Sequence, residues 1–196
     1  MIARVDNKLR APPTPLPAFE AWSQDDAYTR VSASGVFLHD RETPVQAVTD
    51  QGPGWWIMTP LRTEAGLVLV NRGFVPSHLK MPADRPDGQT PGVVRVQGFL
   101  RASEPDGGFL RANTPEAGRW YSRDVAAIAH AKGLAPQVAP FFIDADATPN
   151  SGGYPIGGLT VVKFRNSHLV YALTWFGLCA LSLAGAAIVV RKKAEA

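Results

Sequence analysis

An uncharged apolar run near the C-terminus constrains this chain more than any other feature. From Leu169 to Val190, twenty-two residues, the sequence contains no Asp, Glu, Lys, Arg or His. As an α-helix the run would be about 33 Å long, enough to cross a hydrocarbon core of about 30 Å. A buried core helix is the alternative interpretation, but uncharged runs in such helices are usually shorter. We therefore predict a transmembrane helix at residues 167–190.

The charges flanking this run predict its orientation. The chain has 20 basic and 17 acidic residues, and three of the basic ones are Arg191, Lys192 and Lys193. The net charge of +3 is therefore mostly a membrane-flank signal, and we expect contact with membrane lipid but no nucleic-acid partner. Lys163 and Arg165 precede the run, so three basic residues against two favour a basic cytoplasmic tail at residues 191–196. The main domain would then lie outside the cytoplasm.

The rest of the chain has the pattern of a β-rich domain. Residues 1–17 predict a short helix over 1–9 followed by a proline-rich linker, because four prolines in "APPTPLP" cannot continue a helix. In residues 18–166, alternating apolar residues and turn signals predict a strand at 28–38 with a bulge at Gly35, a hairpin at 54–76, strands at 92–101 and 140–149, and a glycine-rich turn leading to a strand at 151–164.

One helix is predicted within this domain, over residues 122–134. Ser122 or Asp124 would cap its N-terminus, and Gly133 would end it. The predicted fold class is α+β: a mostly antiparallel β extracytoplasmic domain with one or two helices, plus a C-terminal transmembrane helix.

The sequence contains none of the common enzyme signatures. There is no GxSxG, HExxH, GxxxxGK[ST] or GxGxxG motif. His39, His78 and His130 stand alone, without neighbours at metal-ligand spacing, and are expected to be surface histidines. We therefore predict that the chain is not an enzyme.

The acidic pairs and the single cysteine add no site. Asp25-Asp26 and the neighbouring Asp144 and Asp146 are interpreted as solvated charges at strand ends. Cys179, the only cysteine, lies inside the apolar run, which excludes an intramolecular disulfide and thiolate-rich zinc sites.

His168 stands at the mouth of the apolar run and is the main candidate ligand. On a helix of 3.6 residues per turn, Trp175 follows His168 at i+7 and Tyr171 lies beside them. Haem iron takes an imidazole nitrogen as an axial ligand, and the macrocycle needs an apolar or aromatic surface. The alternative is an interfacial belt, in which these side chains only anchor the helix at the headgroups. The residues alone leave both interpretations open.

Arg72 presents a similar choice at the end of an apolar strand. Its guanidinium could pair with a haem propionate or with a partner's carboxylate. It could instead be structural, bonded to backbone carbonyls or to an acidic neighbour.

Four segments carry a resemblance to a known family. In order along the chain they are "MTPLRTEAGLVLVNRGFVP", "VQGFLR", "RWYSRDV" and "NSHLVYALTWFGL". With them the sequence resembles the Surfeit-locus cytochrome c oxidase assembly family, Surfeit locus protein 1, of the bacterial type. The resemblance also implies that the first transmembrane helix, which members of this family carry, is missing from this sequence.

The resemblance implies a function and a location. It implies a multi-pass protein of the cell inner membrane with a periplasmic main domain and a cytoplasmic C-terminus. It also implies an assembly factor for the haem-copper terminal oxidase that binds haem a and assists its delivery into subunit I, with haem A synthase as a further partner. His168, as iron ligand, and Trp175 and Tyr171 would then contact haem a. The alternatives are a haem-free scaffold that stabilises an oxidase subunit or haem A synthase, and an unrelated membrane-anchored enzyme.

Overall fold

The computed structural model describes residues 2–108, 111–159 and 168–194. The chain divides into two compact units, Met1–Thr160 and Val161–Ala196. The helices of the first unit are α1 (Ile2–Arg10) and α2 (Val125–Ala131). Its strands are β1 (Thr14–Pro15), β2 (Arg30–Phe37), β3 (Thr43–Thr49), β4 (Gly52–Thr63), β5 (Gly66–Pro76), β6 (Val93–Ala102) and β7 (Val138–Ala145). The second unit contains α3 (His168–Ala194).

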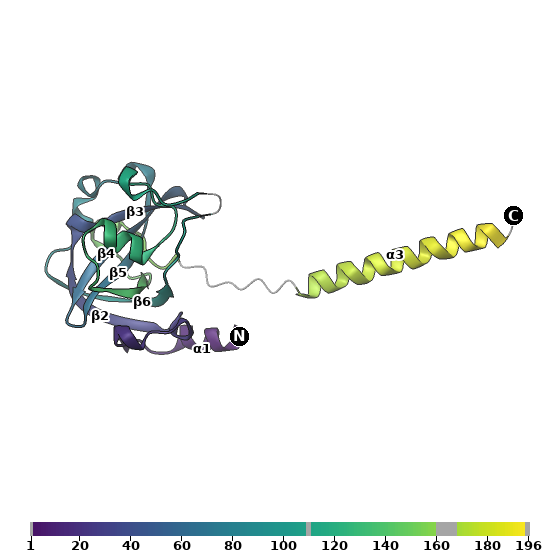
Figure 1. Ribbon diagram of the computed structural model, residues 1–196, viewed down its shortest axis with the longest axis horizontal. Coiled ribbons are helices and arrows are strands. Elements are labelled where there is room, and N and C mark those ends of the chain that lie inside the picture. Colours follow the sequence, from purple (N-terminus) through teal and green to yellow (C-terminus); the bar gives the residue numbers. More distant parts are fainter. Residues whose placement is uncertain (1, 109–110, 160–167, 195–196) are drawn as a thin grey trace. The chain divides into compact units, whose positions relative to one another are not determined.

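The strands of the first unit form one sheet that closes on itself (Figure 1). Their order is β1-β2-β6-β7-β5-β4-β3, and β4 also pairs with β2. This second pairing joins β2, β6, β7, β5 and β4 into a ring, with β1 and β3 attached outside it. The predicted α+β class with a mostly β domain is therefore confirmed.

Gly35 allows the ring to close. The register of β2 with β6 continues through Gly35 without a shift, so the bulge predicted there is wrong. A Cβ at Gly35 would overlap the backbone carbonyl of Arg62 on β4, and only glycine permits this approach. A register shift occurs instead in the β4–β5 pairing: Trp56 pairs with Phe74 and Met58 with Asn71, so β5 contains one extra residue there.

Strands β5 and β7 run parallel at the centre of a sheet that is otherwise mostly antiparallel, as predicted. Their register places Val70 opposite Ile143 and Asn71 opposite Asp144. Both strands bury both faces: Val70 belongs to the core inside the ring, while Leu69 belongs to a second core under α2. Strands buried on both faces give continuous apolar runs, so alternation could not reveal how they pair.

Helix α2 covers one outer face of the ring. It buries Val125, Ile128 and Ala129, and the carboxylate of Asp124 accepts a hydrogen bond from the Ala127 amide at 3.1 Å. Of the two predicted caps, Ser122 and Asp124, it is therefore Asp124 that caps the helix. A helix of seven residues is not stable in isolation, so packing against β7 holds it in place.

Most of the predicted strands are present in the structure, and two further strands were not predicted. The strand at 28–38, the hairpin at 54–76 and the strands at 92–101 and 140–149 correspond to β2, β4–β5, β6 and β7. Strands β1 and β3 were not predicted. Within residues 151–159 there is only an isolated bridge from Ile156 to Phe74 instead of the predicted strand, and residues 160–164 lie outside the described part.

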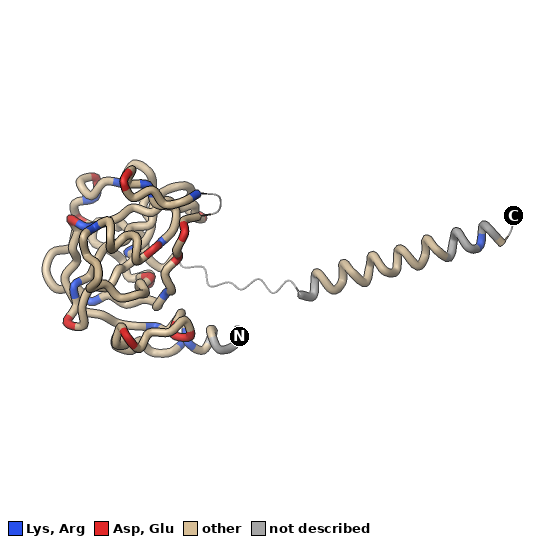
Figure 2. The backbone as a smooth tube through the Cα atoms, viewed as in Figure 1, with Lys and Arg blue, Asp and Glu red and all other residues tan. Residues whose placement is uncertain are grey.

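The C-terminal unit is helical over the segment where a helix was predicted. Figure 2 shows no charged residue along 171–186 of α3, whereas both signs are interspersed over the first unit. Among the residues that the structure describes, no helix has both the length and the apolar character needed to span a membrane. The transmembrane role of residues 167–190 stays a prediction.

Candidate functional site

The element at residues 71–73 ties β5 to two other parts of the domain. The amide nitrogen of Asn71 donates to the Asp144 carboxylate on β7 at 2.7 Å, and its amide oxygen accepts from the Gly73 backbone at 3.2 Å. Gly73 has a φ of +129°, and a Cβ there would overlap the carbonyl of Ile156. Both backbone conformation and space therefore require glycine.

Asp144 is the centre of a buried charge network. Its side chain is 1% exposed and accepts from Arg101 Nη1 at 3.0 Å and from Arg123 Nη1 at 3.1 Å. Arg123 also donates to Glu104, from Nε at 3.0 Å and from Nη2 at 2.5 Å. The interpretation of Asp144 as a solvated strand-end charge is wrong, because β7 lies between β5 and β6 and both neighbours cover it.

The network shifts the pKa of two of its members. Burial alone would raise the pKa of Glu104, but the hydrogen bonds and the charge of Arg123 outweigh burial, and the pKa of Glu104 is lowered. Burial alone would lower the pKa of Arg123, but Asp144 and Glu104 outweigh it, and that pKa is raised. Both groups are therefore held in their charged forms.

Arg72 is also buried, and it pairs with no carboxylate in the part of the chain that the structure describes. It is 1% exposed, and its Nη2 donates to the carbonyl of Gly88 and to the side-chain oxygen of Asn150, the latter at 3.2 Å. Its guanidinium also lies 4.7 Å from the centre of the Phe37 ring. These contacts agree with a structural arginine, but they do not neutralise its charge.

A second buried ion pair lies near Arg72. Arg85 donates to Glu42, and both side chains are 3% exposed. Arg85 also donates from Nε to the carbonyl of Leu79 at 3.0 Å, which fixes the loop before β6. The pair influences Arg72 from a distance, since Glu42 raises and Arg85 lowers its pKa.

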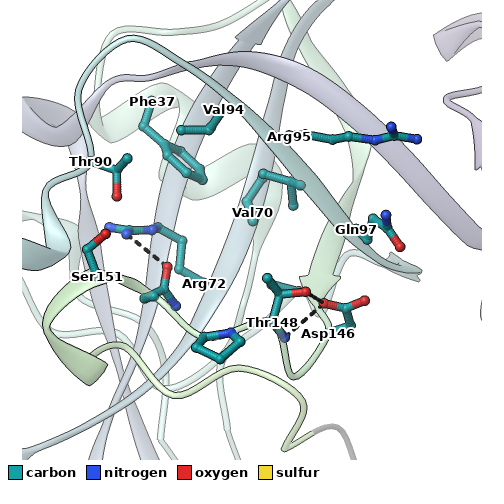
Figure 3. A pocket seen from close by; sticks show the side chains of 14 residues that line it. Phe37, Val70, Arg72, Thr90, Val94, Arg95, Gln97, Asp146, Thr148 and Ser151 are labelled. Atoms are coloured by element: carbon teal, nitrogen blue, oxygen red, sulfur yellow. Dashed lines mark hydrogen bonds between the residues drawn. The ribbon is translucent and has the colours of Figure 1, made fainter.

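Arg72 lines a cavity of about 200 Å³ (Figure 3). The cavity wall comes from the ends of β2, β5, β6 and β7 and from the loops around Thr90 and residues 148–151. In Figure 3 the guanidinium lies below the Phe37 ring, between Thr90 and Ser151.

Helix α3 presents the aromatic residues predicted from the sequence. Tyr171 is 66% exposed and Trp175 is 70% exposed, and their four-residue spacing places them on one face of the helix. His168 is the first residue of α3, and its side chain lies outside the described part of the chain.

Residues 1–180 match the SURF1 family. The chain belongs to the SURF1 family. It is 37% identical over 197 aligned positions to Surfeit locus protein 1 of Rattus norvegicus and 36% identical over 198 to that of Homo sapiens, with 92% of the chain covered in each case. A SURF1-like protein of Monosiga brevicollis is 37% identical over 199 positions, with 94% of the chain covered. The chain spans 63% of the rat protein, 65% of the human protein and 74% of the Monosiga protein.

The family match extends over both units of this SURF1-family chain. It contains the 71–73 element, Asp144, and α3 as far as Ala180, including His168 and Trp175. The resemblance inferred from the four quoted segments is therefore confirmed.

The remaining histidines of this SURF1-family chain do not form a site in the described residues. His78 and His130 are exposed, as predicted, whereas His39 is half-buried and its Nε2 lies 3.0 Å from the carbonyl of Thr90. Within the described residues, no three His, Cys, Asp or Glu side chains come together as metal ligands.

Sequence reasoning missed the charged groups of the interior. Arg101, Glu104 and Arg123 pair with one another or with Asp144 across the sheet, at separations of up to 43 residues. The one local signal is Asp144 itself, which directly follows the apolar run Phe141–Ile143 within a strand. A charge inside such a run indicates a buried partner.

Proposed function

We propose that this chain is an assembly factor for the haem-copper terminal oxidase, cytochrome c oxidase, and that it carries haem a for delivery into subunit I. Membership of the SURF1 family, across the sheet domain and α3 as far as Ala180, is the observation that carries the proposal. The proposed partners are subunit I and, in the same assembly step, haem A synthase. The chain is proposed to act by binding and release and not as an enzyme.

The proposed haem contact is the face of α3 that begins at His168. Tyr171 and Trp175 are well exposed on this face, so they can offer flat apolar surface to a macrocycle. An imidazole at the start of the helix would supply one axial ligand to the iron. This face could therefore bind haem a through one axial ligand and aromatic contacts, and release it without breaking a covalent bond to the protein.

We also propose that α3 anchors the chain in the cell inner membrane. The uncharged run Leu169–Val190 and the basic residues after it support this placement. The sheet domain would then be periplasmic and the C-terminus cytoplasmic. In this position His168 would lie at the headgroup level, where propionates of a bound haem can reach water.

The alternative proposal is a haem-free scaffold that stabilises an oxidase subunit or haem A synthase. One observation favours it: large apolar side chains, including Leu173, Phe176 and Leu181, are exposed along α3. Ala180 and Ala184, spaced four apart, would let another helix approach closely. Such a face can bury a partner's helix without any cofactor.

Titration of haem a separates the two proposals. The full chain in detergent is titrated with haem a, and the Soret band is followed. His168→Phe keeps an aromatic side chain at the helix mouth but removes the ligand nitrogen, so it should abolish or shift the Soret band of the bound form. His130→Phe, on the exposed surface of α2, is the matched control and should leave the spectrum unchanged. Unaltered spectra in His168→Phe would exclude the ligand and favour the scaffold.

A further inference from the structure

The cavity at Arg72 contains a buried cation that is not paired with any anion among the described residues. Arg72 is 1% exposed, and its two hydrogen-bond acceptors, the Gly88 carbonyl and the Asn150 side chain, are both neutral. Among the described residues it has no ion pair, and its Nε and Nη1 have no hydrogen-bond partner. A buried charge in this condition costs several kcal/mol unless something compensates for it.

The guanidinium keeps its charge in spite of burial. Burial lowers the pKa of Arg72 to about 10, with Glu42 opposing the shift, so the group remains protonated at neutral pH. Glu42 does not compensate Arg72 directly, because its ion pair is with Arg85. The three side chains therefore carry one positive charge in excess.

The other charges at the cavity do not cancel this excess. Asp146 pairs with Arg30 at 3.4 Å and accepts a hydrogen bond from the Thr148 backbone at 3.0 Å. Arg95 is exposed and donates from Nε to Ser32 Oγ at 2.9 Å. The interior of the cavity therefore lacks one negative charge, which a monoanion would supply. Exposed Arg95 is not part of this interior charge, so a phosphate dianion would leave the interior with one negative charge in excess, close to Asp146.

The size and lining of the cavity restrict the ligand further. About 200 Å³ lies below the 300–1,000 Å³ of pockets that enclose drug-sized ligands, so a macrocycle does not fit inside. Phe37, Val70 and Val94 form an apolar part of the wall, and Thr90 and Ser151 add hydroxyl groups beside the guanidinium (Figure 3).

We propose that this cavity binds a single carboxylate group at the end of a short aliphatic chain, with Arg72 as its counter-ion. The carboxylate accepts a hydrogen bond from one of the unpartnered guanidinium donors, Nε or Nη1, because a hydrogen bond between arginine and a carboxylate is charge-assisted. The aliphatic chain contacts the apolar wall. This inference does not rest on the proposed haem function, because it concerns residues of the sheet domain only.

The test is a titration of the full chain, in detergent and with ¹⁵N-labelled arginine, followed by NMR of the arginine Nε–H signals. Sodium propionate should shift the Arg72 signal saturably, and at least tenfold more tightly than sodium phosphate at the same ionic strength. Arg72→Lys assigns the signal by its disappearance. The signal of exposed Arg41 serves as the internal control and should not saturate. No saturable shift at Arg72, or the same shift with sodium chloride, would overturn the proposal and leave Arg72 purely structural.

A cavity-filling variant tests the place of binding without removing the cation. Val94→Trp should fill the space and weaken propionate binding at least tenfold, with the far-UV circular dichroism of the parent. Val48→Trp places the same side chain at an 83% exposed position of β3 away from the cavity lining, and should bind propionate as the parent does. Equal affinity in a folded Val94→Trp protein would exclude this cavity.

Two sources of the carboxylate are distinguished by competition. A porphyrin with free propionates, and its dimethyl ester, are each added to the propionate complex. Competition by the acid alone assigns the carboxylate to the arm of a larger ligand, and competition by neither assigns it to a free small carboxylate. Competition by both to the same extent would mean that carboxylate is not recognised, and would contradict the proposal. Because the readout is the Arg72 signal, the result is independent of the His168 spectrum.

Discussion

Asn71 and Asp144, 73 residues apart in the chain, are hydrogen bonded at 2.7 Å across the parallel pair β5–β7. This bond connects the 71–73 element, which carries Arg72 and Gly73, to the buried charges of Arg101 and Arg123. The position of Arg72 at its cavity therefore depends on the same network that stabilises the centre of the sheet.

Asp144→Asn should destabilise the domain by about 3–5 kcal/mol, because two half-buried arginines would lose the buried carboxylate that they share. Urea unfolding of the full chain measures the change. Asp40→Asn is the control: Asp40 is an exposed partner of Arg41, and its loss should cost less than about 1 kcal/mol. Equal effects of the two substitutions would show that the Asp144 network does not contribute to stability.

Gly73→Ala should destabilise the domain by more than about 2 kcal/mol, since both the positive φ and the overlap with the Ile156 carbonyl oppose a Cβ. Gly118→Ala is the control that measures the cost of a positive φ without steric overlap. Gly118 also has a positive φ, of +62°, but no atom lies within 4 Å of its Cβ position, so a cost of about 1 kcal/mol is expected. Thermal unfolding of both variants would refute the crowding argument if their midpoints were equal.

The lowered pKa of Glu104 predicts a loss of stability in acid. A carboxyl group with a lowered folded-state pKa contributes stability above its unfolded value, 4.5, and loses it as the pH falls through the folded value. In Glu104→Gln the free energy of unfolding should therefore fall less steeply below about pH 4.5 than in the parent. Glu64→Gln, in the exposed turn of the β4–β5 hairpin, should keep the parent's profile. If the free energy of unfolding had the same pH dependence in Glu104→Gln and the parent, Glu104 would not cause the loss of stability in acid.

Trp175→Ala should weaken haem a binding by about 0.5–1.5 kcal/mol, or up to about tenfold, because an aromatic contact is lost while the ligand is retained. Absorbance titration gives the affinity. Phe176→Ala is the matched control, since Phe176 is equally exposed but lies on a different face of α3. Equal losses in the two variants would point to general hydrophobic adsorption.

A reporter fused after Lys193 in the full-length chain should be active only in the cytoplasm, as the basic residues after the apolar run predict. A second reporter, one that works only in the periplasm, should be active when it is inserted at Glu64, in the hairpin turn. Activity of the Lys193 fusion in the periplasm would reverse the proposed orientation.

The sequence by itself determined the elements whose signals are local. The hairpin turn at 63–66, the Asp124 cap of α2, the apolar run of α3 and the four family segments can each be recognised within a few neighbouring residues. Their physical causes act over short distances: turn geometry, capping hydrogen bonds and helix periodicity.

Tertiary structure decided which strands are neighbours and which charges are buried. Strands β5 and β7 carry apolar residues on both faces, so no alternation indicated that they pair, or that they pair in parallel. Asp144 appeared as a strand-end charge until its partners came from β5, from β6 and from the segment before α2. The sequence also could not show that Arg72 has no carboxylate partner among the described residues. Ion pairs across a sheet depend on distances between residues far apart in sequence, and only the folded chain sets those distances.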